Sequence, residues 1–156
     1  MSIEPIRRSI VVPLSPERSF ALFTGRMGEW WPRGKTPGGQ HVDVVVEPHA
    51  GGGWFERDAA GTVTKWGKIL VWEPPARLII GWQLNSDCRY DPEFLNEVEI
   101  TFTSEARGGT LVRLEHRGLE KFGVSGRLRA DNIDSGWTER LSDFTAFVAQ
   151  DARQEA

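Results

Sequence analysis

Hydrophobic and polar positions alternate over most of the chain, which is typical of strands with one buried and one exposed face. The clearest example is the stretch 94–104, where Val98, Ile100 and Phe102 alternate with glutamates and threonines. Similar stretches are separated by turn residues, among them a Pro-Pro pair and several Gly pairs. The pattern predicts seven strands, at residues 3–12, 41–47, 51–58, 63–73, 77–84, 94–104 and 110–116.

Two short helices are predicted between the first and second strands. Ser15 can cap a helix and Pro16 suits the first helical position, so a helix is expected to begin there. A second short helix is predicted at 27–31, where Pro32 ends it. The residues that follow, 33–40, are rich in Gly and Pro and are predicted to form a loop.

The end of the chain changes from strand to helix periodicity. Apolar residues recur there at spacings of three and four, which places them on one face of a long helix. This stripe consists of Ile133, Trp137, Leu141, Phe144 and Val148. We expect the opposite, exposed face to carry Glu139, Arg140, Ser142 and Asp143. Residues 150–156 are expected to fray, as chain ends often do.

The order of these elements predicts the fold class. One strand, two short helices, six further strands and one long helix describe an α+β fold, in which a curved antiparallel sheet of about six to seven strands wraps around the C-terminal helix. A strongly curved sheet cannot close over one straight helix along its whole length. We therefore expect a cavity between the sheet and the helix.

Length and charge narrow the functional classes. The chain has 156 residues, which is the size of one domain, so residues 1–156 are predicted to form a single ligand-binding domain. The net charge of -3 argues against a nucleic-acid partner, and no stretch is long and apolar enough to span a membrane. With a single cysteine, no signal peptide pattern and no cofactor motif, we expect a cytoplasmic protein without a cofactor or a metal.

Tryptophan is unusually abundant and supplies most of the candidate site residues. Seven tryptophans cannot all lie on the surface, so they either fill the core or line a cavity, where their indole N–H donors would fix the orientation of a ligand. Trp30 and Trp31 are adjacent and are not expected to point into the same core, so we expect one of them to line a pocket mouth or a partner interface. The candidates for lining the cavity are Trp31, Trp54, Trp66, Trp82, His116, Trp137 and Phe144.

Polar chemistry has few candidates. His116 shares a predicted face with Val112 and Leu114, so it is expected to face the helix, as a ligand anchor, a general base or a hydrogen-bonded core residue. Glu56 and Glu115 are candidate polar groups of the cavity, although a solvated strand face is the ordinary position for such acids. Cys88 is interpreted as an incidental loop cysteine, because no histidine base accompanies it.

Glycines require separate interpretations. The clusters at 38–39 and 51–53 do not join a strand to a helix in a phosphate-binding pattern and are interpreted as turns and bends. Gly136 lies inside the predicted final helix, where glycine is unfavourable. Either a close approach of the helix to the sheet or room for a ligand beside Trp137 would explain it.

Several local motifs, taken together, resemble one known family. These motifs are the helix start followed by Trp30-Trp31, the Gly51-Gly52-Gly53-Trp54 strand, the Gly67-Lys68-Ile69 to Glu73-Pro74-Pro75 block with Arg77-Leu78 and Trp82, the strand after Gly109-Thr110 with His116, and Gly136-Trp137. They are similar to the family named after the activator of a heat-shock-protein ATPase, within the START-like (SRPBCC, helix-grip) superfamily. The chain begins with the first predicted strand, so we expect it to lack the cochaperone's additional N-terminal domain.

The resemblance implies a helix-grip fold and leaves three functions open. Members of the superfamily bind lipids, steroids or polyketides, so the main expectation is a protein that binds a hydrophobic or aromatic small molecule and is not an enzyme. A cyclase or hydrolase would use the same cavity and would need His116 within hydrogen-bond reach of Glu56 or Glu115. A chaperone-type partner, or a homodimer, would need an exposed apolar patch, with Trp30 as its expected centre.

Overall fold

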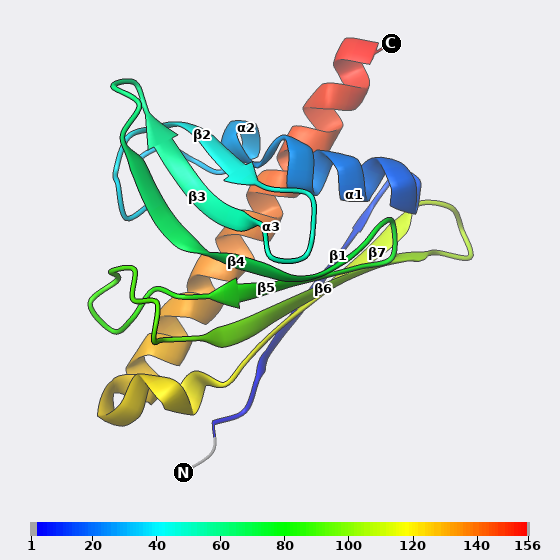
Figure 1. Ribbon diagram of the computed structural model, residues 1–156. Coiled ribbons are helices and arrows are strands. Elements are labelled where there is room, and N and C mark those ends of the chain that lie inside the picture. Colours follow the sequence, from blue (N-terminus) through cyan, green and yellow to red (C-terminus); the bar gives the residue numbers. More distant parts are fainter. Residues whose placement is uncertain (1–2, 156) are drawn as a thin grey trace.

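One seven-stranded antiparallel sheet curls around the long C-terminal helix (Figure 1). A computed structural model describes residues 3–155. The strand order is β1-β7-β6-β5-β4-β3-β2, so strands that are neighbours in the sequence are neighbours in the sheet except at β1. The strands are β1 (Ile6–Val12), β2 (His41–Val46), β3 (Gly53–Asp58), β4 (Val63–Glu73), β5 (Arg77–Trp82), β6 (Asn96–Ser104) and β7 (Thr110–Arg117). The predicted fold class and all seven predicted strands are confirmed.

The bend of the sheet is concentrated in its β2-to-β5 half. The pairings β2–β3, β3–β4 and β4–β5 each contain a register shift, whereas β1–β7, β5–β6 and β6–β7 pair without one. An extra residue on one strand bends it and increases its twist. Gly67 marks the tightest approach, because a Cβ there would lie 1.9 Å from the carbonyl oxygen of Gly81. This half of the sheet therefore turns towards the helices.

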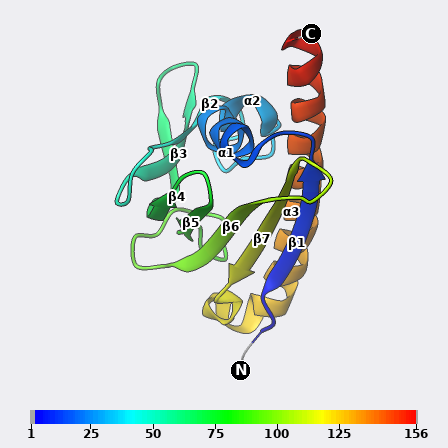
Figure 2. The same cartoon turned by 90° about the vertical axis from the view of Figure 1, so that its right-hand side faces the viewer.

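Two short helices cover the bent half of the sheet. Helix α1 (Pro16–Gly25) begins as predicted: the hydroxyl of Ser15 accepts a hydrogen bond from the backbone N–H of Arg18 at 3.1 Å. Helix α2 (Met27–Trp30) follows directly. Figure 2 shows both helices between the β3 side of the sheet and α3. They bury aromatic side chains, among them Phe23, in one continuous core.

The final helix, α3 (Gly126–Glu155), lies against the concave face of the sheet. All five residues of the predicted apolar stripe, from Ile133 to Val148, are buried, which confirms the stripe. The helix begins seven residues before Ile133, and a 3-10 helix, η1 (Leu119–Ser125), precedes it. Sequence reasoning missed this beginning because its residues are mostly polar and carry no apolar periodicity.

The C-terminal part of α3 is connected to α1 at Asp151. Asp151 is only 6% exposed, and its two carboxylate oxygens accept hydrogen bonds from Arg18 at 2.9 Å and Arg26 at 2.8 Å. These bonds connect the last turns of α3 to both ends of α1. The expectation that residues 150–156 fray is therefore wrong at Asp151. Helix α3 continues to Glu155, and Ala156 lies outside the described residues.

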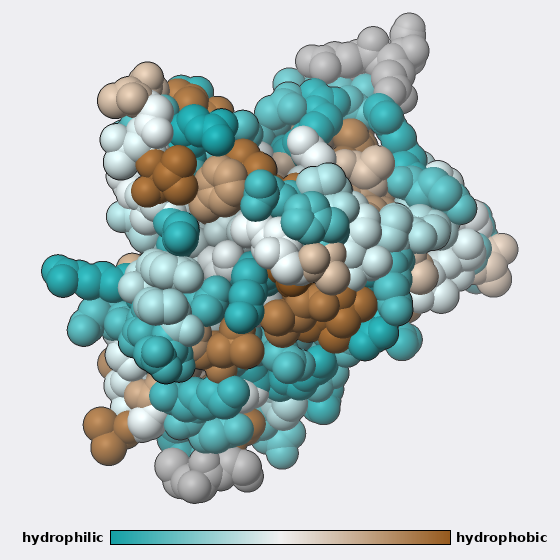
Figure 3. Space-filling view, in the orientation of Figure 1, coloured by the Kyte–Doolittle hydropathy of each residue, from teal (hydrophilic) through white to brown (hydrophobic). Residues whose placement is uncertain are grey.

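Exposed apolar side chains are dispersed on the surface. Figure 3 shows hydrophobic patches interrupted by hydrophilic residues on the face viewed. Trp30 is 3% exposed, so the apolar patch expected around it is not formed. Its ring instead packs against Phe23 and Phe144. Among the residues described, no helix combines the length and the apolar character needed to cross a membrane.

The Asp151 contacts predict a measurable stabilisation. We expect Asp151→Asn to lower the free energy of unfolding by about 1–2 kcal/mol, because it removes the charge shared by two partly exposed arginines. Denaturant unfolding would measure the difference. Asp131→Asn, at an exposed position of the same helix, is the control and should change stability by less than about 0.5 kcal/mol. Equal effects of the two substitutions would contradict a role for Asp151 in holding α3.

Candidate functional site

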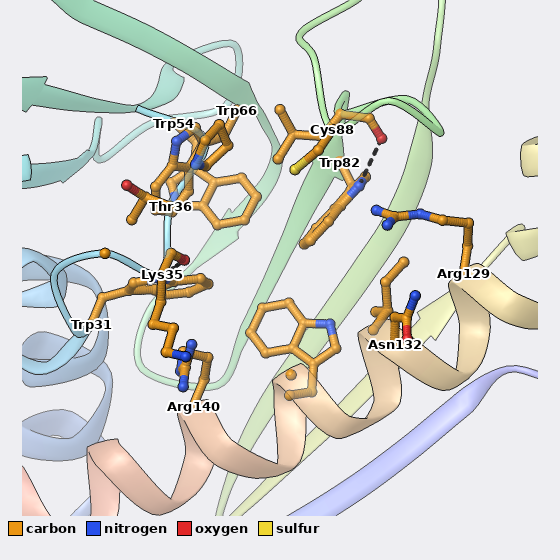
Figure 4. Close-up of a pocket in the computed structure, with 16 residues that line it drawn as sticks. Trp31, Lys35, Thr36, Trp54, Trp66, Trp82, Cys88, Arg129, Asn132 and Arg140 are labelled. Atoms are coloured by element: carbon orange, nitrogen blue, oxygen red, sulfur yellow. Dashed lines mark hydrogen bonds between the residues drawn. The ribbon is translucent and has the colours of Figure 1, made fainter. Parts of the chain in front are cut away.

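A pocket of about 290 Å³ lies between the concave face of the sheet and α3. Figure 4 shows side chains entering it from three sides: the strands, helix α3, and the loop that follows α2. This position is the one expected for a cavity left between a curved sheet and a straight helix. The volume is at the small end of the range of ligand pockets, about 300–1,000 Å³.

Five tryptophans line the pocket and contact one another in a closed cycle, the tryptophan ring, within which Trp31 and Trp54 also approach to 6.3 Å. Trp31 follows α2, Trp54, Trp66 and Trp82 lie on β3, β4 and β5, and Trp137 lies on α3. Around the ring, in the order 31, 66, 54, 82, 137 and back to 31, neighbouring ring centroids are 5.0, 5.0, 5.9, 6.1 and 5.9 Å apart. These are favourable distances for tilted and edge-to-face aromatic pairs. Five of the seven residues predicted to line a cavity are thus brought together.

Every indole N–H group of this tryptophan ring already donates a hydrogen bond within the protein. Trp31 donates to the carbonyl oxygen of Lys35, Trp54 to the sulfur of Met27 and Trp66 to Oε1 of Glu56. Trp82 donates to the carbonyl oxygen of Leu84, and Trp137 donates to Nδ1 of His116. The distances run from 2.9 to 3.2 Å. The expectation that indole donors orient a ligand is therefore wrong: the walls present aromatic faces, not donors.

His116 lies behind the pocket wall and does not line the pocket. It is fully buried on the helix side of β7, as predicted. Its Nε2 donates to Oδ1 of Asn96 at 2.6 Å, and its Nδ1 accepts from Trp137 at 3.1 Å. Both ring nitrogens are therefore hydrogen-bonded while the imidazole is neutral. Burial lowers the pKa of His116 to about 3. His116 therefore holds Trp137 in place instead of anchoring a ligand.

The two candidate glutamates have different positions. Glu56 is 2% exposed, and its carboxylate accepts hydrogen bonds from Trp66, the hydroxyl of Thr36 and the backbone N–H of Gly38, at 2.9, 2.8 and 2.7 Å. It thus fastens the loop after α2 to the sheet, and the solvated-face interpretation is wrong for it. Glu115 lies on the outer face of β7, 3.6 Å from Arg7. No pair of His116 with either glutamate is formed.

Phe144 and Trp30 lie beyond the pocket. Phe144 is fully buried, with its ring centroid 5.2 Å from that of Phe23 and 5.3 Å from that of Trp30. It lies two helical turns after Trp137, where α1 and α2 cover α3, so it belongs to the solid core. Trp30 and Trp31 are adjacent members of this one core, with centroids 5.7 Å apart. The prediction that they avoid a common core is wrong, although Trp31 does line the pocket.

Three cationic side chains at the pocket were not predicted as site residues: Lys35, Arg129 and Arg140. Arg140 was expected on the exposed face of α3, but it is 8% exposed and its guanidinium lies 5.9 Å from the ring centroid of Trp31. Lys35 belongs to the Gly- and Pro-rich loop, which has no periodicity to reveal its direction. Cys88, the expected incidental cysteine, is exposed at the rim.

Gly136 leaves open space in the pocket wall. A Cβ at this position would have no atom within 4 Å. Of the two explanations considered for this glycine, close approach to the sheet is therefore wrong, and room beside Trp137 is what the geometry provides. Among residues 3–155, no cluster of three or more His, Cys, Asp or Glu side chains could hold a metal ion.

Comparisons with known proteins agree with the resemblance seen in the motifs. A family model described as "Activator of Hsp90 ATPase homolog 1-like protein" matches residues 13–149. The solved structure of Txn09, an anthrahydroquino-gamma-pyrone synthase, is 33% identical, with 85% of this chain and 88% of that chain covered and a TM-score of 0.61. CalC, a self-sacrificing resistance protein from Micromonospora echinospora, is 29% identical, with 95% and 96% covered and a TM-score of 0.67.

A more distant structure supports the fold alone. Protein MLL2253 from Mesorhizobium loti is 19% identical, with 94% of this chain and 97% of that chain covered and a TM-score of 0.68. A comparison with curated proteins finds no match.

The buried neutral His116 predicts a pH dependence of stability. Its pKa is about 3 in the folded protein and near its ordinary value of 6.5 in the unfolded chain, so between these values the unfolded chain binds the proton. The stabilisation is complete above pH 6.5 and is lost as the pH falls towards 3, by at most about 1.4 kcal/mol per pH unit.

Denaturant unfolding at several pH values would measure this slope. His116→Gln should reduce the slope of the unfolding free energy against pH, between pH 6 and 4, by the amount that corresponds to one bound proton. His49→Gln, at an exposed position, should leave this slope unchanged. Identical slopes in the wild-type protein and in His116→Gln would show that His116 is not held neutral.

Proposed function

Because the chain belongs to the family of activator of Hsp90 ATPase homolog 1-like proteins, we propose that it uses the helix-grip cavity of that family to bind a flat, hydrophobic aromatic small molecule. The observation that carries this proposal is the set of five mutually contacting indoles that line one pocket. Flat aromatic compounds gain from stacking and edge contacts with such walls, and they exclude water from them.

The polarity of the walls supports an aromatic ligand over a strongly polar one. The indole donors are bonded within the protein, so the tryptophan ring offers apolar faces and no free hydrogen-bonding groups. Apolar linings with few polar groups are typical of small-molecule sites. The volume of about 290 Å³ suits a compound of two or three fused rings better than a long lipid chain.

The similar structures support the same ligand class. Txn09 is named as a synthase of an anthrahydroquino-gamma-pyrone, a fused-ring aromatic compound. At 33% identity over most of both chains, this likeness makes a fused-ring product of the polyketide type a reasonable ligand for the present protein. CalC is named as a self-sacrificing resistance protein, which favours protection against such a compound as a use of the pocket.

The name of Txn09 also favours a second candidate function, a cyclase or hydrolase type of enzyme acting in the same pocket. His116 and Glu56 are committed to hydrogen bonds in the walls, so proton transfer would have to use Lys35, Cys88 or bound water. Incubation of the protein with a bound polyketide-type compound, followed by mass spectrometry, would separate the two functions. An unchanged ligand mass supports binding, and a changed mass supports catalysis.

Filling the open space at Gly136 tests the proposed binding site. We expect Gly136→Leu to weaken the binding of 2-naphthamide, a neutral flat aromatic compound, by about tenfold or more, because the new side chain would occupy the pocket. Isothermal titration calorimetry would measure the affinity. Gly25→Leu is the matched control, since a Cβ at this exposed helical glycine also has no atom within 4 Å but lies outside the pocket.

Melting temperatures of the two variants would show that both are folded. Equal affinity of both variants for 2-naphthamide would place the binding site elsewhere and contradict the proposal.

A further inference from the structure

We propose that the pocket selects an aromatic ligand that carries a negative charge, such as a carboxylate or an ionised phenol, and that Arg129 is the residue that binds this charge. The inference rests on the proposed function, because it assigns the ligand class of the same pocket. It follows from the charges around the pocket, which differ from those of the chain as a whole.

The pocket lining is cationic although the chain is acidic. The net charge of the chain is -3, yet Lys35, Arg129 and Arg140 line the pocket and no aspartate or glutamate does. Glu56, the acid held behind the Trp66 wall, has its carboxylate occupied by three hydrogen bonds. A bound cation would therefore meet positive charges at the rim and no carboxylate to pair with, while an anion would meet unopposed positive charge.

Arg140 is already neutralised by the protein. Its guanidinium donates to Asp143 at 2.9 Å and to Glu139 at 3.1 Å, and both acids lie on α3 beside it. The same guanidinium stacks over Trp31. These contacts explain how an arginine can be 8% exposed, and they leave it a part of the wall.

Arg129 is not neutralised in this way. It is half-buried, no ion pair with a carboxylate is formed by it among the described residues, and its Nε is buried without a hydrogen-bond partner. Its guanidinium lies 5.6 Å from the ring centroid of Phe122. In Figure 4 the side chain projects from α3 towards the indole of Trp82, at one side of the pocket. An unpaired, partly desolvated guanidinium that faces an aromatic pocket is suited to an anionic group of a ligand.

The position of Arg129 on its helix points in the same direction. Arg129 lies in the first turns of α3, which has no acid in its first turn. Cations are unfavourable there, because the N-terminal end of a helix carries partial positive charge. An anion bound at Arg129 would pair with the guanidinium and would also offset the partial positive charge of this helix end.

Lys35 supplies a second, more exposed cation. It is exposed on the loop at the rim, and no ion pair is recorded for it among residues 3–155. Its backbone carbonyl is fixed by the indole of Trp31, so the residue stays beside the pocket while its ammonium group remains in solvent. We therefore assign Lys35 to attracting an anionic ligand and Arg129 to holding it.

A matched pair of ligands tests this inference. The compounds 2-naphthoate and 2-naphthamide have the same fused rings and differ in one negative charge. Isothermal titration calorimetry at pH 7.5 should show that the wild-type protein binds 2-naphthoate about tenfold or more tightly than 2-naphthamide, the range expected for hydrogen bonds to a charged group.

Two arginine variants locate the charge recognition. Arg129→Gln should abolish the preference for 2-naphthoate, because it weakens the binding of 2-naphthoate by about tenfold or more and that of 2-naphthamide much less. Arg127→Gln removes the same charge two residues away, at an exposed position outside the pocket, and should keep the preference. Arg129→Lys keeps the charge but loses the planar guanidinium, so it should retain part of the preference. It also serves as the test if Arg129→Gln fails to fold.

The outcomes separate this inference from the proposed function. Equal binding of the two compounds to the wild-type protein, or an unchanged preference in both Arg129 variants, would overturn the anion proposal and leave the aromatic site standing. Failure of both compounds to bind would overturn both proposals.

Discussion

The structure depends on one geometric constraint, the packing of a straight helix against a sheet that bends. The apolar stripe of α3 contacts the sheet at Trp137 and the short helices at Phe144. The register shifts among β2, β3, β4 and β5 bend that half of the sheet away from a flat surface. Large aromatic side chains fill most of the space between them. Helices α1 and α2 close one end with a solid core around Phe23, and the pocket is the part of the space that remains.

The pocket walls are held by hydrogen bonds that start from buried groups. Glu56 connects the loop after α2 to the sheet and to Trp66, and His116 connects β7 to Trp137 and to Asn96. A buried polar group is unfavourable unless it is hydrogen-bonded, so both residues also favour the particular positions of their partners. The residues that resembled catalytic candidates in the sequence thus organise the walls, while the charges left unpaired at the pocket belong to Lys35 and Arg129.

The sequence predicted the elements well and the polar part of the site poorly, for physical reasons. Strand alternation and the stripe from Ile133 to Val148 report burial directly, so they located the sheet, the helix and four of the five pocket tryptophans. Glu56 shares a strand face with Trp54, and this indicated that it is buried. The general tendency of acidic side chains to be exposed led to the opposite prediction. Arg129 and Lys35 lie at a helix start and in a loop, where no periodicity reveals direction. Arg140 lies three residues after Trp137, at the edge of the stripe, where α2 and Trp31 cover it.

The hydrogen bonds of the five indoles have a consequence for selectivity. Each wall residue is restrained at its ring edge, so rotating it to admit a differently shaped guest would break a bond as well as a ring contact. Little rotamer freedom then remains to be lost on complex formation, which is the condition under which rigid guests bind well. For the proposed aromatic ligand, such preorganised walls would favour planar molecules over twisted or branched ones of equal hydrophobicity, because the walls would have to break hydrogen bonds to adapt to the latter.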